Sequence, residues 1–148
     1  MLFPFHLPYQ DNWHCLPQMA NPTLNLSTLN GINGFRINGI AADDGSGYSV
    51  SSAGDVNGDG IDDLIIGASG ADPNGSSSGQ SYVVFGNRSG FGTVLNLSTF
   101  NGSNGFIING SAIDDYSGVS VSSAEDVNGD GIDDLIIGAN GVDISGIG

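Results

Sequence analysis

The chain has 148 residues, enough for one domain with a hydrophobic core, and a formal net charge of −14 at pH 7. Its only Lys or Arg residues are Arg36 and Arg88, which argues against binding to nucleic acid or to anionic membrane surfaces. No apolar run is long enough to insert into a membrane. Gly occurs 25 times, Lys is absent and Glu125 is the single Glu, so good helix formers are scarce and the composition favours an all-β fold.

The start of the chain differs in composition from the rest. The first 20 residues hold both histidines, the only cysteine and three of the five prolines. Pro4 and Pro8 interrupt the apolar run that a signal peptide needs, so no signal peptide is recognisable. We expect residues 1–22 to be an atypical, poorly ordered arm, and residues 23–148 to form the domain.

An internal repeat fills the expected domain. LNLST occurs at Leu24–Thr28 and at Leu95–Thr99, and DVNGDGIDDLIIGA is identical at Asp55–Ala68 and Asp126–Ala139. Both pairs are offset by 71 residues, from Leu24 to Leu95 and from Asp55 to Asp126. A fixed period of this kind indicates duplication of one structural unit.

In chain order, Phe35–Ala41 is the first expected strand and the last strand of an incomplete unit. The complete unit that follows contains four short segments with strand-like patterns: Tyr48–Ala53, Leu64–Ala68, Gln80–Phe85 and Phe106–Ala112. The segment LNLST lies in a connection. Val119–Ala139 then repeats the first two strands of the unit.

Four short antiparallel strands per unit are typical of a β-propeller blade. We therefore predict an all-β partial β-propeller, with one complete four-stranded antiparallel blade flanked by two partial blades. A propeller closes with about four to eight blades. We expect this chain to be a fragment of a longer protein or to associate with a protein partner or with itself.

Each Asp-rich loop has the spacing of a calcium site. Side chains at positions 1, 3 and 5 of such a tight loop converge, Gly at position 6 permits the turn, and Asp at position 9 can close the shell. The carbonyl at position 7 adds an oxygen, whereas Asp62 at position 8 should point away. The spacing predicts two Ca²⁺ sites, with ligands Asp55, Asn57, Asp59, Ile61 and Asp63, and Asp126, Asn128, Asp130, Ile132 and Asp134.

Two other calcium motifs begin in the same way but do not fit. An EF-hand needs a bidentate Glu at position 12, where this chain has Ile66 and Ile137. A dockerin-like module needs a helix after the loop, which the β-branched run at Ile65 and Ile66 disfavours.

The segments GYSVSSAGDVNGDGIDDLIIGAS and GVSVSSAEDVNGDGIDDLIIGAN resemble the FG-GAP repeat of the integrin α-chain β-propeller. The resemblance covers residues 24–148 and implies that the calcium loop joins the first two strands of a blade. The Phe-Gly of the family falls here on Ser46–Gly47 and Ser117–Gly118, and the Pro of its Gly-Ala-Pro is replaced by Ser69 and Asn140.

The resemblance implies an extracellular or cell-surface module for protein interaction or cell adhesion. Two alternatives remain: an accessory propeller of a secreted, phospholipase-like hydrolase, or a purely structural surface repeat. The repeats contain no His, Cys or Lys, the usual general bases and nucleophiles, so we expect no enzyme activity. The acidic pairs Asp43–Asp44 and Asp114–Asp115 are expected to cap turns.

Overall fold

The structure is a computed structural model that describes residues 23–141. These residues form eight strands and two short 3-10 turns, η1 (Leu26–Thr28) and η2 (Leu97–Thr99), without an α-helix. The all-β prediction is therefore confirmed for this part of the chain. The prediction of a poorly ordered arm at residues 1–22 lies outside the described residues.

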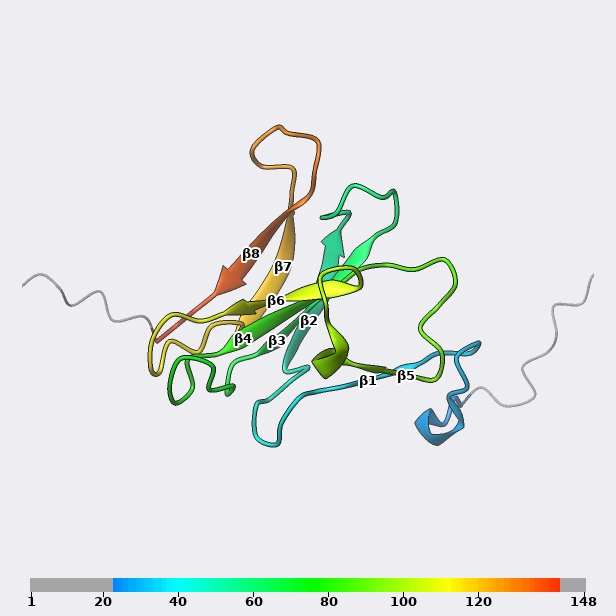
Figure 1. Ribbon diagram of the computed structural model, residues 1–148, viewed down its shortest axis with the longest axis horizontal. Coiled ribbons are helices and arrows are strands. Elements are labelled where there is room, and N and C mark those ends of the chain that lie inside the picture. The colour runs from blue at the N-terminus through cyan, green and yellow to red at the C-terminus, as the bar shows by residue number, and fades with distance from the viewer. Residues whose placement is uncertain (1–22, 142–148) are drawn as a thin grey trace, which may run out of the picture.

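The centre of the molecule is a four-stranded antiparallel sheet (Figure 1). Its strand order follows the chain, and its members are β2 (Ser49–Gly54), β3 (Asp63–Ala68), β4 (Gln80–Val84) and β6 (Gly105–Asn109). All four predicted strands of the complete unit are present, with ends that differ from the prediction by at most three residues. The last strand is the shortest relative to expectation, since the chain turns after Gly110.

The turn after β6 is closed by a side chain. The Asp115 carboxylate accepts hydrogen bonds from the Ser111 hydroxyl at 2.7 Å and from the Ala112 N–H at 2.8 Å. In the preceding repeat Asp44 accepts from the Ala41 N–H at 3.2 Å. The prediction that these acidic residues cap turns is thus confirmed for Asp44 and Asp115.

The two central strands put their side chains on opposite faces of the sheet. Ile65 lies opposite Val83, and Ile66 lies opposite Tyr82. Successive residues of a strand point to opposite faces. Ile65 and Val83 therefore belong to one apolar cluster and Ile66 and Tyr82 to another. A sheet that is apolar on both faces needs a covering layer on each side.

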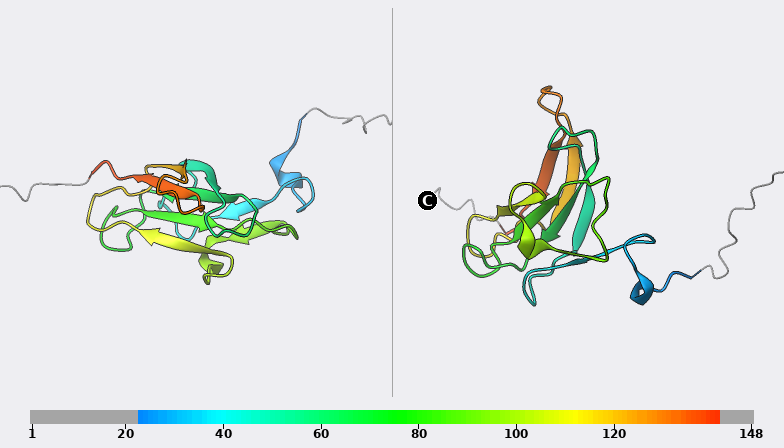
Figure 2. Two further views of the ribbon diagram at one scale, coloured as in Figure 1. Left: turned by 90° about the horizontal axis from the view of Figure 1, so that it is seen from above. Right: turned by 45° about the vertical axis from the view of Figure 1, so that its right-hand side comes forward.

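The first covering layer is the hairpin of β7 (Ser120–Glu125) and β8 (Asp134–Gly138), which are antiparallel. Val121, Leu135 and Ile137 of this hairpin pack into the cluster formed by Ile65 and Val83. Figure 2 shows the hairpin lying against the central sheet. The two strands predicted within Val119–Ala139 are both present.

The second covering layer departs from the predicted arrangement. β1 (Arg36–Asn38) is shorter than the expected strand Phe35–Ala41, and it pairs in parallel with β5 (Val94–Asn96). We predicted no partner for this strand within the chain and placed LNLST in a connection. The pairing joins segments far apart in sequence through one parallel backbone ladder and an Asn38–Asn96 amide hydrogen bond of 2.8 Å. The periodicity of a short segment cannot predict such a contact, because the paired residues lie far apart in the chain.

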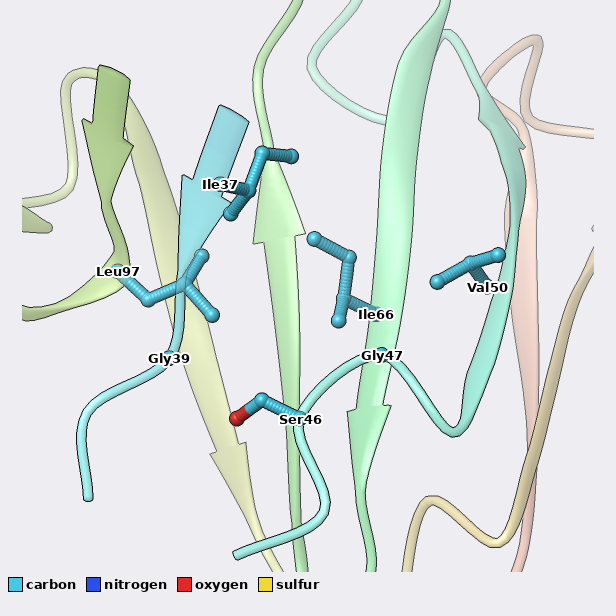
Figure 3. A pocket seen from close by; sticks show the side chains of 7 residues that line it. All are labelled: Ile37, Gly39, Ser46, Gly47, Val50, Ile66 and Leu97. Carbon is cyan, nitrogen blue, oxygen red and sulfur yellow. The ribbon is translucent and has the colours of Figure 1, made fainter. Parts of the chain in front are cut away.

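This second layer covers the face that carries Ile66 and Tyr82. Ile37 of β1, Leu95 of β5 and Leu97 of η2 pack there. Figure 3 shows Ile37 and Ile66 pointing toward one another across a small hollow between β1 and the sheet. The hollow is lined mainly by apolar side chains, and no charged residue lines it.

Candidate metal site

The two Asp-rich loops connect β2 to β3 and β7 to β8. They project from the same end of the molecule and lie next to one another (Figures 1 and 2). Each loop follows a β-bulge, between Ser52 and Gly54 in one hairpin and between Ser123 and Glu125 in the other. A bulge adds twist to the strand and redirects the chain. The bulge thus sets the direction in which each loop leaves its strand.

In the first loop, side-chain oxygens turn inward onto the backbone. The Asp55 carboxylate accepts hydrogen bonds from the N–H groups of Asp59, at 3.0 Å, and Gly60, at 2.8 Å. Asn57 Oδ1 accepts from Asp59 N–H at 2.9 Å, and Asp59 Oδ1 accepts from Ile61 N–H at 2.9 Å. Gly60 has a φ of 79°, which a residue with a side chain adopts only with strain. Positions 1, 3, 5, 6 and 7 are therefore one hydrogen-bonded turn.

The last predicted ligand of the first loop is fully buried. Both oxygens of Asp63 accept backbone hydrogen bonds, from Gly86 N–H at 2.7 Å and Val56 N–H at 3.2 Å. Burial raises the pKa of Asp63; the two N–H groups act against this, and the negative charges of Asp59 and Asp55 raise the pKa further. The charges of Asp55 and Asp59 thus disfavour the ionised form of Asp63.

The second loop repeats this hydrogen-bond pattern in a more exposed setting. Asp126 accepts from the N–H groups of Gly131 at 2.9 Å, Gly129 at 2.7 Å and Asp130 at 3.0 Å, and these bonds lower its pKa. The remaining ligand candidates repeat three contacts of the first loop: Asn128 accepts from Asp130, Asp130 accepts from Ile132, and Asp134 accepts from Val127. The loops differ at Asp134, whose Oδ1 accepts from Asn128 Nδ2 at 3.2 Å, whereas Asp63 Oδ1 accepts from the Gly86 N–H.

The donor set of each loop fits a hard cation such as Ca²⁺. An ionised carboxylate has about four lone-pair positions, and Asp55 uses two of them for hydrogen bonds within the loop. The N–H bonds also fix the conformation of the loop. Within residues 23–141, however, no three Asp, Glu, His or Cys side chains are gathered into a metal-binding group. The calcium ligands therefore remain a prediction.

Position 8 of the loop has a contact that we did not predict. We expected Asp62 to point away from its own loop. Its equivalent Asp133 contacts the neighbouring first loop, where its Oδ2 accepts from the Asp55 N–H at 2.8 Å. Asp62, the equivalent residue of the first loop, is exposed. The contact of Asp133 depends on how the two hairpins stack. The spacing of residues within one loop cannot predict that stacking.

The fold and the loops together define the class of protein. It is a repeat protein of short antiparallel strands, with an Asp-rich turn between the first two strands of each unit. The FG-GAP repeat family matches residues 46–84 and 117–148, which contain both loops. The chain carries FG-GAP repeats.

A curated relative agrees with this assignment. The chain is 34% identical over 116 residues to integrin alpha pat-2 of Caenorhabditis elegans. The match covers 77% of this chain and 9% of the nematode protein, so the chain spans less than a tenth of that relative. Among the described residues, no helix has both the length and the apolar character to cross a membrane.

Proposed function

We propose that this chain is a calcium-binding module of a β-propeller, formed by FG-GAP repeats. The observation that carries the proposal is the pair of loops in which the oxygens at positions 1, 3 and 5 are already turned inward by backbone hydrogen bonds. Two copies of the same turn, each rich in carboxylates, are more consistent with a cation site than with a solvated turn.

A bound Ca²⁺ ion would supply positive charge where the first loop has only negative charge. The ligands would be Asp55, Asn57, Asp59, the carbonyl of Ile61, and Asp63; the equivalents in the second loop are Asp126, Asn128, Asp130, Ile132 and Asp134. Ca²⁺ takes six to eight oxygens, so water would complete each shell. Burial raises the pKa of Asp63, and a nearby cation would offset this by stabilising the ionised carboxylate.

The stacking of the sheets supports a propeller. The central sheet has four antiparallel strands and an apolar layer on each face, as a blade between two neighbours would. In this interpretation β1 belongs to the preceding blade, and β7 and β8 begin the following one. The exposed Ile136 then lies on the face that a further blade would cover.

We further propose an extracellular or cell-surface role in protein interaction or adhesion, rather than catalysis. Similarity to an integrin α chain supports this, as does the lack of His, Cys and Lys from the repeats. The partner would be a protein, since a net charge of −14 opposes both nucleic acid and anionic lipid.

The test is a Ca²⁺ titration into chelator-stripped protein by isothermal calorimetry, with thermal unfolding recorded before and after. We expect two bound ions and a higher melting temperature, because an ion that binds only the folded state stabilises it. Mg²⁺ serves as the control cation, since it requires near-octahedral geometry and keeps its water. No Ca²⁺ binding would refute the proposal.

A further inference from the structure

The two hairpins that carry the loops are almost identical in sequence. Residues 49–68 and 120–139 differ at one position, where Gly54 of the first hairpin is replaced by Glu125 in the second. Both residues sit at the bulge in left-handed conformation, with φ of 72° and 56°. The backbone is therefore alike at the two positions, and the difference lies in the side chain.

The missing side chain of Gly54 makes room for the neighbouring hairpin. A Cβ atom added at Gly54 would lie 2.6 Å from Asp133 Cβ. Rotating the Asp133 side chain would not relieve this overlap, because Cβ is fixed to the backbone. The same approach lets the Asp133 carboxylate accept the Asp55 N–H at 2.8 Å. Gly54 thus leaves a space, here called the seat, that the Asp133 side chain of the next hairpin occupies.

Because the hairpins are repeats, residues equivalent to those that pack between them also lie on exposed surfaces of the molecule. Asp62 on the first hairpin is equivalent to Asp133 and is exposed. Val50, 65% exposed, is equivalent to Val121, which packs between the hairpins. Ile136, 60% exposed, is equivalent to Ile65, against which the second hairpin packs. The first hairpin of a second copy therefore has the residues needed to stack on β7 and β8, except that the seat there is Glu125.

We propose that the Gly54–Asp133 contact is the docking contact between successive hairpins, and that Glu125 closes the equivalent seat against a second copy of this chain. Because Glu125 has a Cβ where docking requires none, the Asp62 of a second copy cannot reach the Asp126 N–H. The second hairpin can stack on the first, but a further identical hairpin cannot stack on the second. One substitution thus prevents an otherwise self-complementary repeat from stacking on a second copy of this chain.

The first test restores the seat with Glu125→Gly and measures association by sedimentation velocity over a range of concentrations. Glycine is compatible with the φ of 56° at this position, so the variant should fold. We expect more self-association than in the wild type, and the double variant with Asp62→Ala should lose the increase. No increase, or an increase that persists without Asp62, would overturn the proposal.

The second test examines the contact inside one chain through amide hydrogen exchange of Asp55, measured by NMR. Loss of a hydrogen bond to a charged group should speed exchange by at least about tenfold. We expect this in Asp133→Ala but not in the matched control Asp62→Ala. Unchanged exchange in Asp133→Ala would show that the docking contact is not formed. Neither test depends on bound calcium.

Discussion

Ile65 and Ile136 are equivalent residues of the repeat, in the same sequence context, yet the structure buries only one of them. Ile65 is 0% exposed between the central sheet and the second hairpin, whereas Ile136 is 60% exposed. Replacing each by alanine therefore compares the same chemical change in two tertiary environments.

The expected losses of unfolding free energy differ severalfold. Truncation of Ile to Ala removes three carbon groups, about 2.4 kcal/mol at about 0.8 kcal/mol each, and a cavity raises the cost at a buried site to about 3–4 kcal/mol. Ile136 is 40% buried by the same measure, so Ile136→Ala should lose at most about 1 kcal/mol.

The measurement is urea unfolding of both variants and the wild type, comparing midpoints at unchanged slope. A change in slope would indicate an altered unfolded or native state rather than lost packing. Equal losses at the two positions, or a larger loss at Ile136, would refute the stacking order that places the second hairpin on the Ile65 face.

Three further predictions address the loops, the strand edges and acid stability. Asp59→Ala should abolish Ca²⁺ binding at the first loop and Asp62→Ala should not; equal loss of affinity by calorimetry would contradict the ligand assignment. The outer edges of β6 and β8 have no partner among the described strands, so the chain should self-associate through them. A monomer by light scattering, at high concentration and with Ca²⁺, would contradict this. Hydrogen bonds from Ser111, mainly from its hydroxyl, and from Ala112 lower the pKa of Asp115. Ionised Asp115 therefore stabilises the fold above its unfolded-state pKa of about 4, and this stabilisation is lost as the pH falls through its lower folded-state pKa. The difference in urea midpoint between the wild type and Asp115→Asn should accordingly narrow below about pH 4, and a constant difference would exclude this role.

The strands of the complete unit could be predicted because each depends on local pattern. The apolar run at Leu64–Ala68 and the turn residues around it are sufficient to place β3. The parallel pairing of β1 with β5 could not be predicted in this way. It depends on contacts between residues about 60 positions apart, including the Asn38–Asn96 amide pair.

The same distinction applies to the candidate site. The spacing of Asp55, Asn57 and Asp59 is sufficient to predict an inward-turned loop, since hydrogen bonds between near neighbours form it. The contact of Asp133 with the first loop was missed because its partner lies in the other repeat. The Gly54-to-Glu125 difference was the one sequence signal for it.

By itself, the sequence determined the all-β class, the 71-residue repeat and the acidic loops, because strand alternation, turn chemistry and ligand spacing are local properties. Only the tertiary structure decided which copy of an identical residue is buried. Ile65 and Ile136 have the same neighbours in the chain, but Ile65 alone has a covering hairpin. Burial depends on what packs against a residue. In a repeat protein, the position of each hairpin in the stack decides which of its residues are covered.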